Sequence, residues 1–193
     1  MSKRTKLNTI RIIAGQWRGR RLSVANVQGL RPTTDRVRET LFNWLALEIE
    51  GARCLDAFAG TGALGLESLS RGAKFVQFIE TDLQAKENLQ QNLKQLNHDL
   101  DNFNSEIIAG NTIELLSCEP SKKFEIVFLD PPFQSKLLAL SMQLLVENNW
   151  LSKEAIIYVE QSANDQLPEL PAAWQIHRQG KAGQSAYYLL RTA

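Results

Sequence analysis

Apolar and polar positions along the chain predict strands that alternate with helices. Short apolar runs of strand length recur, and between them apolar residues repeat every three to four positions, as on one face of a helix. The predicted strands are 53–58, 75–80, 105–109, 124–129 and 155–160, and the predicted helices are 63–71, 82–97, 111–118 and 136–148. This alternation favours an α/β fold with a Rossmann-like, doubly wound and mostly parallel sheet.

Both ends of the chain depart from this alternation. Near the start, two short apolar runs, 10–14 and 20–24, flank a glycine-bounded turn and predict a small β-hairpin. Near the end, 174–178 and 186–190 are joined by the glycine-containing segment 180–183. They predict an antiparallel hairpin that brings the sheet to seven strands.

A helix is predicted just after the N-terminal hairpin. Thr33 or Thr34 can cap it, and its apolar residues recur at helical spacing as a buried stripe that comprises Val37, Leu41, Trp44 and Leu45. Arg36 and Arg38 fall off this stripe, so they either face phosphate or are solvated beside acidic neighbours. We expect residues 1–31 to form a basic arm and hairpin, and residues 32–193 to form the α/β domain.

The net charge of +1 conceals an uneven distribution of charge. Residues 1–38 hold ten Lys or Arg and one acid, a net charge of +9, whereas the remainder holds 12 basic and 20 acidic residues, a net charge of −8. A basic segment on an acidic body is typical of nucleic-acid binding, and a solubilising tail is the alternative. The candidate RNA-binding residues are Arg11, Arg18, Arg20, Arg21, Arg31, Arg36 and Arg38.

Trp17 lies among the hairpin arginines. Arginine with an interleaved aromatic can bind phosphate and stack on an unpaired base. Alternatively, Trp17 pins the hairpin to the body of the protein. The sequence leaves both interpretations open.

Cysteine and histidine usage argues against a metal site. The two cysteines and two histidines show no metal-ligand spacing, and Cys54 is expected to be a buried apolar residue on the first strand. The chain also lacks an apolar run of membrane length and a signal peptide. We therefore expect a cytoplasmic protein with one main core, without metal or membrane, and acting as a monomer.

The first predicted strand leads into a glycine turn, Gly60-Thr61-Gly62, that opens a helix. Glycines there allow a tight turn and close approach of a ligand, while the helix start offers unpaired N–H groups. Glu80 ends the next strand and can accept hydrogen bonds from ribose hydroxyls. Since Gly60 to Gly65 also fits the dinucleotide-binding pattern G-x-G-x-x-G, this site predicts an adenosine cofactor, which is either NAD or S-adenosylmethionine.

A second site follows the fourth predicted strand at Asp130-Pro131-Pro132-Phe133. Two prolines stiffen the loop and remove two N–H donors, so the loop offers acceptors, the Asp130 carboxylate and the Pro131 carbonyl. Two acceptors suit the two N–H groups of an exocyclic amine on a nucleobase and aim the nitrogen lone pair at an electrophile. Phe133 can stack on the base; a rigid turn with an exposed aspartate is the alternative interpretation.

These motifs resemble a known family. Residues 56–62 (DAFAGTG), followed by 130–133 (DPPF), resemble the paired signature of class I S-adenosylmethionine-dependent methyltransferases that act on exocyclic amines. With 11–15 (RIIAG) and 31–43 (RPTTDRVRETLFN), the chain resembles the RsmD family, which methylates the N2 of a guanine in small-subunit (16S) ribosomal RNA. The resemblance covers nearly the whole chain, and the Arg-Pro-Thr segment is its most discriminating part.

The resemblance implies roles for individual residues. In the cofactor half, Asp56 and the glycine turn hold the methionine end of S-adenosylmethionine, Glu80 binds the ribose and Asn111 contacts the adenine. The implied cofactor-binding set is Asp56, Phe58, Ala59, Gly60, Gly62, Glu80 and Asn111. In the acceptor half, Asp130 and Pro131 orient the guanine amine and Phe133 stacks on the base, so the implied catalytic set is Asp130, Pro131, Pro132 and Phe133.

Three alternatives remain at this stage. The same chemistry can act on adenine N6 or cytosine N4 in DNA or another RNA, although a chain of this size has no evident DNA target-recognition domain. An NAD-dependent oxidoreductase would share the glycine turn but would leave the acceptor loop without a role. A non-catalytic RNA-binding module would have no need of that loop. The expected reaction product is S-adenosylhomocysteine, and the expected partner is 16S ribosomal RNA within a small-subunit particle.

Overall fold

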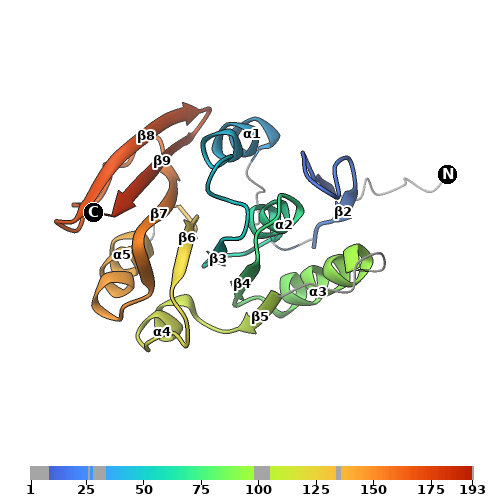
Figure 1. Cartoon of the computed structure of the whole chain (residues 1–193), viewed down its shortest axis with the longest axis horizontal. Coiled ribbons are helices and arrows are strands. Elements are labelled where there is room, and N and C mark those ends of the chain that lie inside the picture. Colours follow the sequence, from blue (N-terminus) through green and yellow to red (C-terminus); the bar gives the residue numbers. More distant parts are fainter. Residues whose placement is uncertain (1–8, 26, 28–33, 98–104, 134–135, 193) are drawn as a thin grey trace.

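A sheet of seven strands forms the middle of the molecule and carries helices on both faces (Figure 1). The structure, a computed structural model, describes residues 9–25, 27, 34–97, 105–133 and 136–192. The strands of this sheet are β3 (Arg53–Asp56), β4 (Phe75–Glu80), β5 (Ser105–Ala109), β6 (Phe124–Leu129), β7 (Leu151–Ser162), β8 (Trp174–Ala182) and β9 (Ser185–Thr192). The helices are α1 (Asp35–Trp44), α2 (Ala63–Ser70), α3 (Leu83–Asn97), α4 (Thr112–Leu116) and α5 (Leu137–Glu147). A separate two-stranded hairpin comprises β1 (Thr9–Arg11) and β2 (Arg21–Ser23).

The strand order is β5-β4-β3-β6-β7-β9-β8. The neighbours from β5 to β7 are parallel, whereas β9 runs antiparallel to both β7 and β8. The predicted fold class is therefore confirmed, including the C-terminal antiparallel hairpin. From β3 the chain moves outward to β4 and β5 and returns to β6 on the other side of β3, so the loops after β3 and β6 diverge and open a crevice at the carboxyl ends of the strands.

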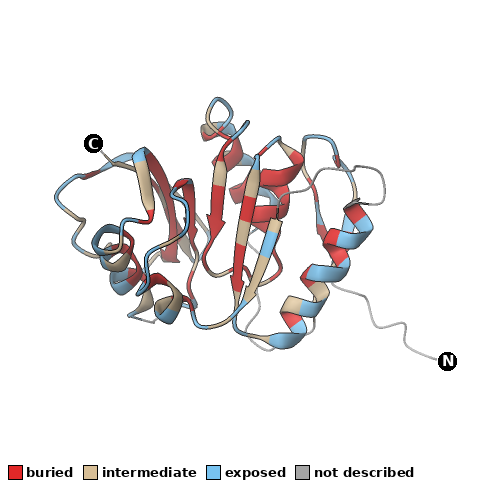
Figure 2. Ribbon diagram, turned by 60° about the horizontal axis from the view of Figure 1, so that its bottom comes forward, coloured by how far each residue is buried: buried red, intermediate tan, exposed pale blue. Residues whose placement is uncertain are grey.

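Successive side chains of the strands point to opposite faces of the sheet and pack into two separate hydrophobic cores. Cys54, Ile126 and Ile156 face a core shared with α1, α2, α3 and the N-terminal hairpin, whereas their successors Leu55, Val127 and Ile157 face a core shared with α4 and α5. Buried residues accordingly dominate the inner strands β3 and β6, whereas the edge strands β5 and β8 are mostly intermediate or exposed (Figure 2). This alternation fixes which residues at the strand ends share a face.

The turn of the C-terminal hairpin differs from the prediction. Residues 180–183 are predicted as the connection, but Ala182 pairs with Ser185, so only Gly183 and Gln184 join the strands. Gly180 belongs to β8, where a Cβ atom would lie 2.5 Å from the ring of Tyr187. Glycine at this position serves a close approach between strands rather than a turn.

The N-terminal hairpin docks on the C-terminal end of α2. The Gln16 N–H donates to the Ser70 carbonyl at 2.8 Å, the Trp17 N–H donates to Ser70 Oγ at 3.1 Å, and Ser70 Oγ donates to the Ala14 carbonyl at 2.6 Å. Gly15 has a φ of +81°, and a Cβ there would lie 1.8 Å from the Ser70 carbonyl oxygen. Trp17 is buried in the first core, so of the two interpretations of Trp17 the structure supports the one in which it pins the hairpin to the body.

Two buried charged residues join this hairpin to α1 and α2. Glu67 accepts hydrogen bonds from the Ile13 and Ala14 N–H groups at 2.8 and 3.0 Å and pairs with Arg71 Nε at 2.7 Å. Arg38 lies 3.8 Å from Glu67 and 2.6 Å from Asp35, and it donates to the Arg11 carbonyl. The prediction that Arg38 falls off the buried stripe and faces phosphate or solvent is wrong, because α2 and the hairpin cover that side of α1.

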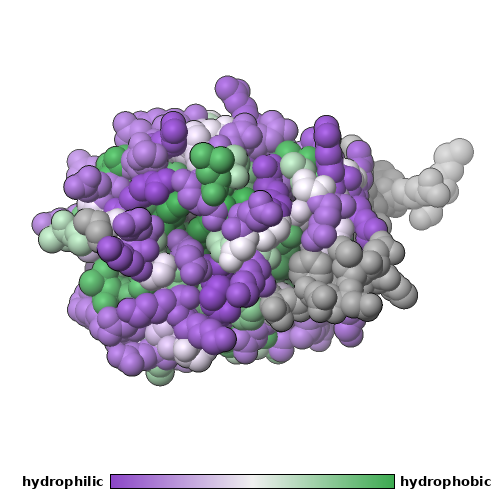
Figure 3. Space-filling model, in the orientation of Figure 1, coloured by the Kyte–Doolittle hydropathy of each residue, from purple (hydrophilic) through white to green (hydrophobic). Residues whose placement is uncertain are grey.

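Hydrophilic residues cover most of the face seen in Figure 3. Among the described helices, none combines the length and the apolar character needed to cross a membrane.

The predicted boundary between residues 31 and 32 lies outside the described residues, as do Thr33 and Arg31. Thr34 is the N-cap of α1 and accepts from the Val37 N–H at 3.4 Å.

Candidate active site

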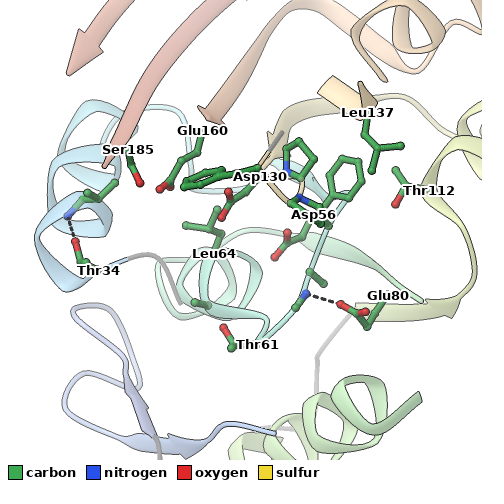
Figure 4. A pocket seen from close by; sticks show the side chains of 18 of the residues that line it. Thr34, Asp56, Thr61, Leu64, Glu80, Thr112, Asp130, Leu137, Glu160 and Ser185 are labelled. Carbon is green, nitrogen blue, oxygen red and sulfur yellow. Dashed lines mark hydrogen bonds between the residues drawn. The ribbon is translucent and has the colours of Figure 1, made fainter. Parts of the chain in front are cut away.

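A cavity of about 1070 Å³ opens at the carboxyl ends of the parallel strands (Figure 4). Its walls come from the turn after β3, the ends of β4, β6 and β7, the loop after β5 and the turn between β8 and β9. The structure thus brings both predicted half-sites to one cavity. The predicted residues that line it are Asp56, Phe58, Ala59, Gly60, Glu80, Asn111, Asp130, Pro131, Pro132 and Phe133.

Gly62 is absent from this lining. It is the N-cap residue of α2 with a φ of +73°, and a Cβ there would meet Leu89 Cδ1 at 2.4 Å. The residue allows the chain to turn into the helix while α3 packs closely behind it. Its predicted direct contact with a cofactor therefore has no support in the geometry, whereas Gly60, with a φ of +52°, does line the cavity.

Glu80 lies at the end of β4 with both carboxylate oxygens engaged. The Gly60 N–H donates to Oε2 at 2.6 Å (Figure 4). The Asp82 N–H donates to Oε1 at 2.8 Å. These bonds tie the glycine turn to β4 and orient the carboxylate along the cavity wall. A carboxylate at this strand end has remaining lone pairs that suit the hydroxyl groups of a ribose.

Asp56, at the end of β3, is a buried carboxyl group with 3% of its surface exposed. Its Oδ2 accepts from the Gly65 N–H at 3.0 Å, and within the described part of the chain it makes no ion pair. The pKa of Asp56 is raised to about 7, because burial raises it, the Gly65 hydrogen bond lowers it by a smaller amount, and the nearby charge of Glu80 adds to the rise. A buried acid without a cationic partner suits a positively charged ligand group in the cavity.

Asn111 and Thr112 form the wall contributed by the loop after β5. Asn111 caps α4, since its Oδ1 accepts from the Ile113 N–H at 2.8 Å. Thr112 Oγ1 donates to the Ala57 carbonyl at 2.5 Å and so fixes this loop against the end of β3. The structure places Asn111 at the cavity as predicted, and Thr112 is a lining residue that the sequence analysis missed.

The acceptor loop lies across the cavity from the glycine turn. Pro131 is buried, and Pro132 and Phe133 are exposed, with 44% of the Phe133 surface accessible. The Ala57 N–H donates to the Phe128 carbonyl at 3.1 Å, which joins the ends of β3 and β6 where the two half-sites meet. An exposed aromatic ring beside a carboxylate and a stiff carbonyl suits a planar base that carries an amine.

The basic residues divide into three groups. Arg18 and Arg21 are exposed on the hairpin, and Arg36 is exposed and lines the cavity. Two others have partners: Arg11 pairs with Asp35 at 3.4 Å and Arg20 donates to the Gln95 carbonyl at 3.4 Å. Arg38 is fully buried and cannot contact RNA, so its predicted binding role is wrong.

Several further lining residues escaped the sequence analysis. Glu160, at the carboxyl end of β7, faces the cavity beside Asp130, and Lys181 to Ser185 bring the turn between β8 and β9 to its rim. The sequence does contain a signal for Glu160, because this residue ends the predicted strand 155–160 as Glu80 ends the predicted strand 75–80. No group of three or more His, Cys, Asp or Glu able to hold a metal ion occurs among the residues that the structure describes.

Comparisons with known proteins agree with this geometry. A family model described as "Conserved hypothetical protein 95" matches residues 10–191. The chain is 51% identical over 180 residues to "Ribosomal RNA small subunit methyltransferase D" of Escherichia coli, covering 93% of this chain and 88% of that protein, and 45% identical to the protein of the same name from Haemophilus influenzae, covering 93% and 92%. The solved structure of the Escherichia coli protein yhhF superposes with a TM-score of 0.88 at 47% identity, covering 96% of this chain and 98% of that one. The resemblance found in the sequence is thus confirmed, and the chain belongs to the RsmD family of ribosomal RNA small subunit methyltransferases.

Proposed function

We propose that this protein transfers the methyl group of S-adenosylmethionine to the exocyclic N2 of a guanine in 16S ribosomal RNA and releases S-adenosylhomocysteine. The observation that carries the proposal is the meeting of the glycine turn and the acceptor loop in one cavity. The names of the relatives in Escherichia coli and Haemophilus influenzae support small-subunit ribosomal RNA as the substrate. We further propose that the protein acts in the cytoplasm, as a monomer, on a small-subunit particle.

The cofactor half of the cavity has the chemistry that S-adenosylmethionine requires. The Asp56 carboxyl group has no described cationic partner and can hold the cationic methionine end, while the oriented Glu80 carboxylate accepts from the ribose hydroxyls. Asn111 lies where it can contact the adenine edge. When bound, S-adenosylmethionine supplies an electrophilic methyl group on its sulfonium centre.

The acceptor half solves the problem that a nucleobase amine is a weak nucleophile. Its lone pair is delocalised into the ring, so Asp130 and the Pro131 carbonyl accept its two N–H groups and turn the lone pair out of the ring plane. Phe133 stacks on the base and holds it against the loop. Alignment of this kind contributes about 7 to 11 kcal/mol to a bimolecular step. As the new bond forms, the nitrogen becomes acidic, and Asp130 is placed to take its proton.

A guanine must leave its stack to reach this cavity. Phosphate contacts from the exposed arginines Arg18, Arg21 and Arg36 would hold the flanking RNA strand. Arg11 and Arg20 belong to the same surface but already have protein partners. The proposed reaction requires no metal ion.

The decisive experiment incubates the protein with methyl-labelled S-adenosylmethionine and unmodified small-subunit particles, followed by nucleoside analysis. We expect label in N2-methylguanosine. A parallel reaction contains duplex DNA in place of the particles, and label in its N6-methyladenine or N4-methylcytosine would instead support the DNA alternative. Heat stabilisation by NAD but not by S-adenosylmethionine would support the oxidoreductase alternative.

Substitution of the acceptor carboxylate separates catalysis from cofactor binding. Asp130→Ala should abolish methyl transfer and change the affinity for S-adenosylmethionine by less than about threefold, a shift within the error expected for a site that does not touch the cofactor. Asp165→Ala, at an exposed aspartate outside the cavity, is the matched control and should retain full activity. An active Asp130→Ala protein would show that another group orients the amine.

The basic surface has its own test. Replacing Arg18 and Arg21 with Ala should weaken RNA binding. It should also make the negative slope of log K against log salt shallower by about 1.4, since each phosphate contact to a single strand contributes about 0.7. Cofactor affinity should stay unchanged. The exposed pair Lys122 and Lys123, changed together to Ala, is the control. An equal slope for both double variants would remove the hairpin from the RNA-binding surface.

A further inference from the structure

Glu160 is a buried carboxylate in the acceptor half of the cavity, and it has no role in the methyl transfer proposed above. It retains 5% of its surface exposed and lines the cavity. Leu129 of β6 pairs with Val159 of β7 in parallel register, so Asp130 and Glu160 are the next residues on two adjacent strands. Adjacent strands lie roughly 4.8 Å apart, which makes these two carboxylates close neighbours.

Both carboxylates also share one face of the sheet. Ile156 and Tyr158 of β7 face the core beside α1 and α2, and Glu160 continues this alternation. Phe128 of β6 faces the same core, so Asp130 follows on the same side. Figure 4 shows the side chains of Asp130 and Glu160 directed into the same cavity.

Tyr158 holds Glu160 in place. Its hydroxyl donates to Glu160 Oε2 at 2.8 Å. Burial raises the pKa of Tyr158 well above its usual value, and the charges of Glu160 and Asp130 raise it further, so the hydroxyl remains a donor. A carboxylate has about four acceptor positions, and this bond uses one of them. Glu160 therefore presents further acceptor capacity in a fixed orientation next to Asp130.

Two adjacent acceptors demand two adjacent donors on the base. Guanine provides them, since its N2 amino group lies beside N1–H. In adenine and in cytosine the ring nitrogen beside the amine is an acceptor without hydrogen, and its lone pair would face the carboxylate and leave both groups unpaired. Uracil has a ring N–H but no amine. Among the four standard bases, guanine alone matches the pair of carboxylates.

We propose that Glu160 selects guanine by accepting a hydrogen bond from N1–H while Asp130 holds the N2 amine. Glu160 is thus a specificity-determining residue, and Tyr158 is its positioning residue. The inference rests on the proposed N2 methylation, and it adds the feature of the base that the enzyme recognises.

The test compares guanine with 2-aminopurine at the acceptor position of small-subunit RNA, introduced by ligation before the particle is assembled. 2-Aminopurine keeps the N2 amine, but its N1 is an acceptor. The wild-type protein should prefer guanine by about 10- to 100-fold in kcat/KM, the range for one hydrogen bond to a charged group. Glu160→Gln offers N1 an amide donor, so its activity on guanine should fall while its activity on 2-aminopurine is retained or rises. The ratio of the two kcat/KM values should then approach one.

Controls separate recognition from structural damage. Glu154→Gln, at an exposed position near the other end of β7, should keep the wild-type ratio. Tyr158→Phe keeps the carboxylate but removes its donor and should lower the ratio by a smaller factor. If Glu160→Gln does not fold, the kcat/KM ratios of Tyr158→Phe and of the wild-type protein still test the role of Glu160.

Two results would overturn the role of Glu160. One is a Glu160→Gln protein that loses activity equally on both bases, so that the ratio is unchanged. The other is a wild-type protein that methylates guanine and 2-aminopurine with equal kcat/KM. Failure of the wild-type protein to form N2-methylguanine would overturn the proposed function itself, and this inference with it.

Discussion

The two ends of α2 each approach a buried carboxyl group, and the two groups differ in their partners. At the N-terminal end, Asp56 bonds the Gly65 N–H and has no ion pair with any described residue. Toward the C-terminal end, Glu67 is fully buried and is joined to Arg38, Arg71 and two N–H groups of the hairpin.

The difference distinguishes a binding group from a structural one. Burying a carboxylate is costly unless cations and donors surround it, and Glu67 has both. Burial raises the pKa of Asp56 to about 7, and no cation among the described residues offsets that rise. Near the docked hairpin, α2 thus carries Glu67, the satisfied acid, which has cationic partners. Near the cavity, α2 bonds Asp56 of β3, the unsatisfied acid, which has no cationic partner among the described residues. Four substitutions or titrations test this contrast.

Removal of the satisfied acid should have the largest effect. Glu67→Ala leaves the Arg38 guanidinium buried and two hairpin N–H groups without an acceptor, so the free energy of unfolding should fall by about 4 kcal/mol. Urea unfolding measures the loss. Glu87→Ala, at an exposed position on α3, should change stability by less than about 0.5 kcal/mol. A loss below about 1 kcal/mol for Glu67→Ala would contradict a structural role for the buried cluster.

Gly15 tests the docking contact at the same end of α2. A Cβ at Gly15 would lie 1.8 Å from the Ser70 carbonyl, so Gly15→Ala combines left-handed strain with a backbone clash and should cost about 3 kcal/mol. Gly19, in the same hairpin, has a φ of +83° but nothing within 4 Å of its Cβ position, so Gly19→Ala should cost only about 1 kcal/mol. Trp17 fluorescence should report an exposed indole for Gly15→Ala alone. Equal losses for the two variants would mean that strain, not docking, sets the cost.

Substitution of the unsatisfied acid should stabilise the free protein. Since the pKa of Asp56 is raised from 3.8 to about 7, the folded state keeps a proton that the unfolded chain releases, and stability from this group falls as pH rises from about 4 to 7. Asp56→Asn removes this loss. It should therefore raise the free energy of unfolding by about 3 kcal/mol more at pH 8 than at pH 4, since a rise in pKa from 3.8 to about 7 corresponds to at most about 4 kcal/mol. Destabilisation at pH 8 would show that the carboxylate has a partner.

The ionisation of Asp56 should also change the affinity for S-adenosylmethionine, and this is the smallest of the four expected effects. A cationic ligand group binds the ionised form of Asp56, so affinity for S-adenosylmethionine should increase by about tenfold from pH 6 to pH 8. Calorimetry in buffers of different ionisation heat should detect the released proton. Asp56→Asn should bind more weakly and without this pH dependence. A wild-type affinity that is flat across this range would mean that Asp56 does not contact the cationic end.

Local sequence signals predict most of the fold and the positions of most candidate site residues. The glycine turn, Glu80 and the two prolines after Asp130 each lie at the end of a recognisable strand, so their positions follow once the sheet is parallel. Arg38 could not be placed in this way, because its burial depends on Glu67 and on the hairpin, which are distant in sequence. Helical spacing alone put it beside the apolar stripe and gave no information on what covers that side.

Glu160 and Gly180 show a second limit. That Glu160 lies beside Asp130 depends on β7 being next to β6 and on the register Leu129 to Val159, neither of which a single strand pattern contains. Gly180 is predicted as a turn residue, but its lack of a side chain accommodates Tyr187 across the strand pair. Local conformation and tertiary approach both select glycine, and the sequence does not distinguish them.

The two hydrogen bonds to Glu80 affect the entropy of binding. A glutamate side chain free to rotate would lose about 0.5 to 1.5 kcal/mol in conformational entropy when a ligand immobilised it. In this protein the Gly60 and Asp82 N–H groups hold both oxygens before any ligand arrives. The rotational freedom of the side chain is already lost when the chain folds, so an incoming diol meets an acceptor that need not be ordered again.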